Sequence, residues 1–122
     1  MANGKLEWVE VPAPDVEASA AFYESVFGWK LKRDGQFEGY LMFEDAGGAM
    51  GGAFTAQHQV ADQPGVLLYI TVESIDRTLA QVEEKGGTAL EPRTLITEEI
   101  GWWGTFRDPA GNVIGVFENP AG

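Results

Sequence analysis

The chain has 122 residues, a length that suits one compact domain with a modest core, and it has no cysteine, which excludes disulfide and thiol chemistry. Its formal net charge of −11 argues against binding to nucleic acid or to an anionic membrane surface, because both need a basic surface. No apolar run approaches the roughly 20 residues of a membrane-spanning helix, and the first residues lack the pattern of a secretion signal, so we expect a cytoplasmic protein.

The first half of the chain predicts a strand, a helix and three further strands. The first strand, at about 5–12, ends in prolines, and Asp15 is a good N-cap for a helix that Gly28 ends. Asp34-Gly35 predicts a turn between two of the strands. The three later strands are expected at about 29–33, 40–44 and 50–55.

The second half repeats this order. A strand at 66–72 precedes a helix that Ser74 caps and Gly86-Gly87 ends. Pro92 lies inside the next apolar segment and predicts an edge strand, because proline cannot donate to a ladder. The sequence Asp-Pro-Ala-Gly at 108–111 predicts the turn of a hairpin. The three later strands are expected at about 88–95, 102–107 and 112–118.

The predicted elements therefore follow the order βαβββ twice within a single domain, 1–122. We assign the first module to 1–56, the second to 66–119 and a polar connecting loop to 57–65. Each half is too small to bury its own sheet face, which favours two modules packed about a pseudo-twofold axis.

The stretch LEWVEV, residues 6–11, raises the question of function. Val9 and Val11 share one face of the strand, while Trp8 and Glu10 share the other. An indole beside a carboxylate suits neither open water nor a dry core. A mixed wall of this kind is typical of a small-molecule pocket.

Other predicted strands place similar residues on the corresponding face. Adjacent tryptophans at 102 and 103 should point to opposite faces, so that one of them lines the same wall. A half-exposed sheet covered by a partner chain is the alternative interpretation. The candidate ligand-binding residues are Trp8, Glu10, Leu67, Tyr69, Trp103, Gly115 and Phe117.

Three phrases in order carry a resemblance to a known superfamily: VPAPDVEASAAFYESVFGWK, TVESIDRTLAQVEEKGG and FRDPAGNVIGVFE. The chain resembles the vicinal oxygen chelate superfamily, which includes glyoxalase I, bleomycin-resistance proteins and extradiol dioxygenases. It is most similar to small bacterial glyoxalase-like proteins of undefined activity. The resemblance implies an α+β fold in which two βαβββ modules form a curved mixed-sheet half-barrel with a cleft, and it implies a homodimer.

The superfamily often holds a metal at four strand positions. By this resemblance they fall on Trp8, at or next to Gly52, on Leu67 and on Gly115, and none of these side chains can ligate a metal. We therefore expect no metal and no cofactor, which puts the usual glyoxalase and dioxygenase chemistry in doubt. The sole histidine, His58, is expected on the surface of a polar loop, or alternatively at the site as part of a lid.

Glu10 has several possible roles. It is the candidate catalytic residue if an apolar wall raises its pKa enough to make it a general base. Alternatively, it accepts a hydrogen bond from Tyr69, binds a ligand amine, or pairs with Arg93 or Arg107.

Two functional hypotheses follow. The first is metal-independent binding of a small aromatic or apolar molecule in the cleft. The alternative is a glyoxalase-like lyase or isomerase, or a dioxygenase-type enzyme, with an unrecognised metal site or Glu10 as base. The sequence pattern does not place the loops at 56–65 and 96–101, which would shape either site.

Overall fold

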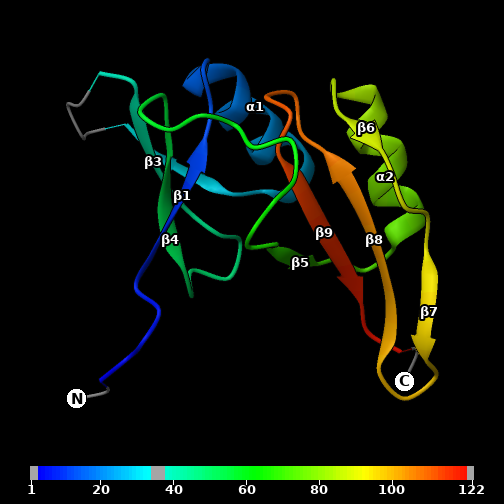
Figure 1. The fold of residues 1–122 in the computed structure, drawn as a ribbon. Helices are drawn as coiled ribbons and strands as arrows, with labels where there is room; N and C mark the ends of the chain where they lie inside the picture. The colour runs from blue at the N-terminus through cyan, green and yellow to red at the C-terminus, as the bar shows by residue number, and fades with distance from the viewer. Residues whose placement is uncertain (1–2, 34–37, 121–122) are drawn as a thin grey trace. The chain divides into compact units, whose positions relative to one another are not determined.

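The computed structural model describes residues 3–33 and 38–120 and has an α+β fold with two helices and two mixed sheets (Figure 1). The chain divides into two compact units, residues 1–59 and 60–122, which we call unit 1 and unit 2. The predicted α+β class is confirmed, with the βαβββ order in unit 1 and one additional short strand in unit 2, and neither sheet closes into a barrel over the described residues. Neither helix in this part of the chain is long and apolar enough to cross a membrane.

Unit 1 is a four-stranded sheet carrying one helix. Its sheet has the order β1-β4-β3-β2, with β1 parallel to β4 and the other neighbours antiparallel. The turn predicted at Asp34-Gly35 lies outside the described residues. The elements are β1 (Trp8–Pro12), α1 (Val16–Phe27), β2 (Lys30–Lys32), β3 (Tyr40–Glu44) and β4 (Gly51–Thr55).

Aromatic rings fill the core of unit 1. Helix α1 begins where the Asp15 carboxylate accepts the Ala18 N–H, and it ends at Gly28, whose φ of 71° is the left-handed cap that glycine favours. From this helix Tyr23 reaches the sheet and is completely buried. Its ring stacks at 4.7 Å on Trp29, the residue just before β2. The opposite face of the same sheet is left for other contacts.

Unit 2 is a sheet of order β5-β9-β8-β6, and β7 also pairs with β8. The strand predicted at 66–72 is shorter than expected, and the one predicted at 88–95 was wrong as a single strand. The segment 88–95 instead contributes to two separate strands, one on each side of Pro92, because proline has no N–H to donate to the ladder with β8. The elements are β5 (Tyr69–Thr71), α2 (Ile75–Glu84), β6 (Thr88–Ala89), β7 (Thr94–Thr97), β8 (Gly101–Arg107) and β9 (Val113–Glu118).

A charged cluster fastens the end of β9 to the start of α2. The Glu118 carboxylate accepts the Ile75 N–H at 2.9 Å, and it also accepts two N–H groups of Arg93 at 3.0–3.3 Å. The Arg93 guanidinium lies 3.9 Å from the centre of the Trp102 ring, a cation–π arrangement. The hydrogen bonds from Arg93, followed by the Ile75 N–H, hold the pKa of Glu118 below its usual value despite its burial.

We predict that Glu118→Gln lowers the free energy of unfolding by about 1–2 kcal/mol at neutral pH, because it removes charge-assisted hydrogen bonds. Since the folded-state pKa is depressed, the carboxylate stabilises the fold above its unfolded pKa, and this contribution is lost as the pH falls below the ordinary value of 4.5. The difference between variant and wild type should therefore shrink in acid. Urea unfolding across this pH range measures it.

Glu17→Gln is the matched control. Its carboxylate pairs with Arg33 at 2.7 Å, but the Glu17 side chain is 62% exposed, so solvent screens the pair. We expect little change in the urea midpoint. Equal destabilisation by the two substitutions would contradict the special role of Glu118.

Candidate functional site

Unit 1 presents Trp8 and Glu10 on the sheet face opposite α1. Val11 lies 3% exposed in the core, whereas Trp8 on the other face is 46% exposed. Trp8 is paired in register with Gly51 of β4, and a Cβ atom on that glycine would lie 3.3 Å from the indole. The missing side chain therefore lets the indole lie close against the sheet.

The polar groups of this face form a continuous hydrogen-bonded chain. The indole Nε1 of Trp8 donates to the Tyr40 hydroxyl at 2.9 Å, and this hydroxyl donates to Oε2 of Glu10 at 2.7 Å. The second carboxylate oxygen, Oε1, lies 2.9 Å from Nε2 of His58. We call these four residues the indole–carboxylate cluster.

Hydrogen bonding sets the protonation of the cluster. The bond from Tyr40, and after it the contact with His58, hold the pKa of Glu10 below its ordinary value. Burial and the bond to Glu10 raise the pKa of Tyr40, so the phenol stays protonated. Glu10 is thus fixed as an acceptor. This is the reverse of the raised pKa that a glutamate base would need.

The sequence offered several alternative partners for Glu10. The arginines proposed as partners of Glu10 have other partners, since Arg93 binds Glu118 and Arg107 binds Asp62 and the Gly111 carbonyl. Within unit 1 a hydrogen bond to Glu10 comes from Tyr40. Glu10 belongs to unit 1 and the three proposed partners belong to unit 2, so those three pairings stay predictions.

His58 was expected as an ordinary surface residue, and the structure brings it to Glu10 while 58% of its side chain stays exposed. The contact joins residues 48 positions apart through an irregular loop. Periodicity could not have found it. Tyr40 was likewise missed, since only the register of β3 with β4 and of β4 with β1 puts it on the same face as Trp8 and Glu10.

Unit 2 carries a separate hollow of about 370 Å³ on its own sheet, lined by Tyr69, Ile96, Trp103 and Phe117. Trp103 and Phe117 are paired in register on neighbouring strands, so their rings lie on one face. Ile96 lies in β7 where the β7–β8 register shifts, in a stretch that the sequence analysis expected as a loop. Three of these four residues are among the predicted ligand-binding positions.

The two adjacent tryptophans take opposite sides of the sheet, as alternation requires. Trp103 lines the hollow, whereas Trp102 packs under Arg93 on the helix side. Gly115 lies beneath Tyr69, where an added Cβ would come within 2.5 Å of the ring. Leu67 is half-buried before β5 and does not line the hollow.

The residues present do not fit the metal that the resemblance implies. A side chain at Gly52 would collide with the Val9 carbonyl oxygen, and a side chain at Gly115 would collide with Tyr69. Trp8 and Leu67 offer no donor atom. Over residues 3–33 and 38–120, no group of three or more His, Cys, Asp or Glu side chains is placed to hold a metal ion.

Comparison with known proteins settles the family. The model of the Glyoxalase/Bleomycin resistance protein/Dioxygenase superfamily matches residues 5–116. The chain belongs to this superfamily. The sequence-based resemblance is thereby confirmed.

Relatives of this superfamily chain include a glyoxylase-like protein and a biosynthesis protein. A glyoxylase-like domain-containing protein of Didymella fabae is 26% identical, over 97% of this chain and 96% of its own length. The anthracycline biosynthesis protein DnrV of Streptomyces peucetius is 30% identical over 95% of this chain. The match spans only 47% of DnrV, so the chain corresponds to about half of that relative.

Solved structures share the fold. A glyoxalase/bleomycin resistance protein/dioxygenase family enzyme from Burkholderia phytofirmans PsJN has a TM-score of 0.77 at 19% identity, covering 93% of this chain and 97% of its own. The antibiotic-binding protein TnmS3 from Streptomyces sp. CB03234 has a TM-score of 0.73 at 25% identity, covering 98% of both chains. The first of these likenesses speaks for the fold alone.

We predict that protein purified without chelators holds no stoichiometric Zn, Ni, Mn or Fe, because the four superfamily positions lack donor atoms. Elemental analysis measures the metal content. Dialysis against a chelator should leave the thermal unfolding midpoint unchanged, since a metal bound to the native state would raise it. About one tightly held transition metal per chain would contradict the prediction and would make Glu10 and His58 the first candidates as ligands.

Proposed function

We propose that this protein binds a flat aromatic or apolar small molecule, without a metal, against the aromatic hollow of unit 2. The observation that carries the proposal is the lining of that hollow, in which Tyr69, Trp103 and Phe117 offer three rings to one space of about 370 Å³. Ligand pockets are lined mainly by apolar and aromatic side chains, and a volume of this size suits a small molecule.

Ring exposure supports the same conclusion. Tyr69 is 52% exposed and Ile96 is 42% exposed, and both line the same hollow, so their exposed apolar surface is contiguous there, which is typical of an interaction site. Stacking on an aromatic ring is worth about 1–3 kcal/mol for each stacked base-like group. Two such contacts are enough for binding at micromolar concentrations when burial of the ligand adds to them.

The relatives give a chemical precedent. TnmS3 binds an antibiotic, and DnrV belongs to the biosynthesis of anthracyclines. The chain shares the fold of TnmS3 and is 30% identical to DnrV over 95% of its own length, and the proposed ligand is a small aromatic compound.

The enzymatic alternative is a glyoxalase-like lyase or isomerase, or a dioxygenase-type enzyme. If Glu10 acted as the base of such an enzyme, its carboxylate would need a raised pKa so that it takes up protons readily. The hydrogen bonds to Tyr40 and His58 favour the ionised form and lower the pKa of Glu10, so it would be a weak base. The geometry therefore favours binding over this form of catalysis.

Homodimerisation and a cytoplasmic location remain part of the proposal. Unit 2 exposes about half of the side chain of Leu95 on β7 and of Ile100 in the following turn. Apolar groups beside an edge strand suit a contact with a second copy. Sedimentation at micromolar concentration tests it, and a monomer would refute this part.

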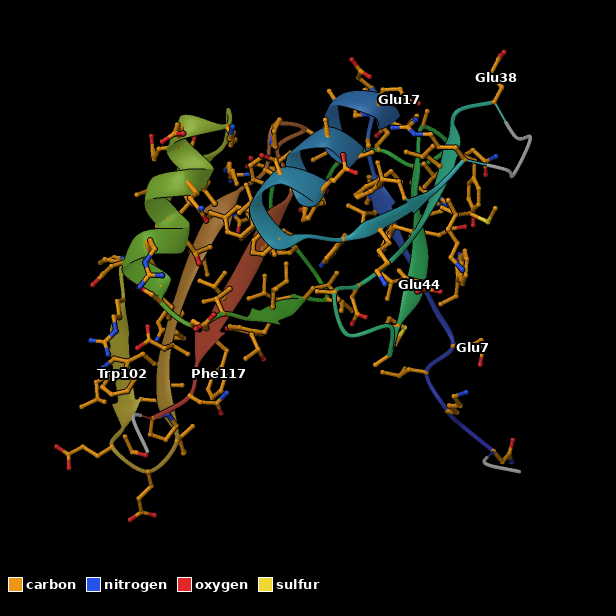
Figure 2. All side chains as sticks on the ribbon, turned by 180° about the vertical axis from the view of Figure 1, so that it is seen from behind. Glu7, Glu17, Glu38, Glu44, Trp102 and Phe117 are labelled. Carbon is orange, nitrogen blue, oxygen red and sulfur yellow. The ribbon has the colours of Figure 1, made fainter. Side chains whose placement is uncertain are left out.

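We predict that Trp103→Ala weakens binding of anthraquinone-2-sulfonate about tenfold to hundredfold, because one stacking ring is lost. The probe is planar, and its negative charge opposes non-specific attraction to a chain of charge −11, whose acids Glu7, Glu17, Glu38 and Glu44 are spread over unit 1 (Figure 2). Calorimetric titration measures the dissociation constant.

Trp102→Ala is the matched control, since it removes a neighbouring indole from the opposite face of the same strand. It should lower the stability of unit 2 by releasing Arg93, yet leave probe affinity in the folded protein unchanged. Equal affinity of wild type and Trp103→Ala would overturn the assignment of the hollow as the binding site.

A further inference from the structure

The directions of the hydrogen bonds in the indole–carboxylate cluster can be worked out from its donors. The indole of Trp8 has one N–H and no acceptor, so the Tyr40 oxygen must accept it. The single hydroxyl proton of Tyr40 is then directed to Oε2 of Glu10. Trp8 and Tyr40 together thus hold the Glu10 carboxylate as a hydrogen-bond acceptor.

The carboxylate in turn fixes the tautomer of His58. An ionised Glu10 only accepts hydrogen bonds, so Nε2 of His58 must carry the proton in their 2.9 Å contact. A neutral imidazole has a single N–H. Its other nitrogen, Nδ1, therefore presents a lone pair that can accept a proton or a hydrogen bond.

The accepting nitrogen is available to a ligand. The His58 side chain is 58% exposed, and Nδ1 makes no hydrogen bond to any residue in the described part of the chain. Trp8, at the other end of the cluster, is 46% exposed and adds an apolar ring to the same sheet face. A carboxylate that orients an imidazole is also the arrangement that stabilises the imidazolium once a proton arrives.

We propose that the indole–carboxylate cluster is a second ligand site, at which Nδ1 of His58 accepts the proton of a weakly acidic hydroxyl group such as that of a phenol. The O–H bond of the phenol breaks and an N–H bond forms at Nδ1, which leaves a phenolate beside an imidazolium. Glu10 stabilises the imidazolium through its hydrogen bond to Nε2–H. No oxidant, metal or other reactant is needed.

Glu10 and Tyr40 are positioning residues in this site, since they act through His58. The net negative charge of the chain disfavours an anion at its surface. The phenolate is retained because the proton that it loses stays beside it on His58. This inference concerns unit 1 only, and it does not depend on the hollow of unit 2.

The test uses p-nitrophenol, whose phenolate absorbs at longer wavelength than the phenol, at a fixed pH where most of the free probe is protonated. Titration with wild-type protein should increase the phenolate band. His58→Gln should weaken binding about tenfold to hundredfold and abolish the change of band, because the accepting nitrogen is lost. 4-Nitroanisole, which lacks the hydroxyl, should show no dependence on His58.

Two further variants distinguish positioning from simple contact. Glu10→Gln can donate its amide N–H to Nε2, so it should reverse the tautomer and lose the phenolate band even though its shape is conserved. Gln59→Ala, an exposed change in the same loop, should behave as wild type. An unchanged band in His58→Gln would overturn the proposal.

A spectroscopic measurement tests the proposal without any ligand. Nitrogen chemical shifts of His58 in the neutral state should report a proton on Nε2 in the wild type and on Nδ1 in Glu10→Gln. A wild-type proton on Nδ1 would refute the proposal directly. Trp103→Ala should leave the p-nitrophenol band intact, and loss of the band in this variant would assign the phenol to the hollow instead, independently of whether anthraquinone-2-sulfonate binds there.

Discussion

Both candidate surfaces depend on one steric arrangement, an aromatic ring lying on a glycine of the neighbouring parallel strand. In unit 1 the ring is Trp8 and the glycine is Gly51, while in unit 2 the ring is Tyr69 and the glycine is Gly115. A side chain on either glycine would meet the ring. Because the space is empty, each ring can lie close to the sheet and keep a large part of its surface exposed.

The two rings then serve different chemistry because their neighbours differ. The indole of Trp8 reaches a phenol hydroxyl and through it a carboxylate, so the surface of unit 1 is an ordered polar network. Tyr69 instead faces other apolar side chains around the hollow of unit 2. The same packing thus leaves a hydrogen-bonded network on the surface of unit 1 and an aromatic hollow on unit 2.

Much of the fold could be predicted because it is determined by local chemistry. Asp15 and Ser74 cap the helices, and the turn after β8 is closed by Asp108, which accepts the Gly111 N–H. Strand alternation also placed Trp8 and Glu10 on one face and Trp103 opposite Trp102. These features need only a few neighbouring residues.

The misses concern contacts that local pattern does not encode. His58 meets Glu10 across 48 residues through the path of a loop, and Ile96 enters the hollow at a shift in strand register. Glu10 was a candidate base on the condition that an apolar wall raised its pKa, but the hydrogen bonds with Tyr40 and His58 lower that pKa. The sheet face on which a residue lies can be predicted from the sequence, whereas its contact with a residue far along the chain cannot.

The steric role of Gly115 also links the missing metal ligand to the aromatic hollow. The superfamily resemblance places a ligating glutamate at this position, yet any side chain here would come within 2.5 Å of the Tyr69 ring. A glutamate could be accommodated only if the ring rotated away, which would remove one wall of the hollow. At Gly52 the obstacle is the Val9 backbone, which cannot rotate away. A glutamate at Gly115 and the aromatic hollow are therefore mutually exclusive in unit 2, and in unit 1 the Val9 backbone prevents a ligating side chain at Gly52.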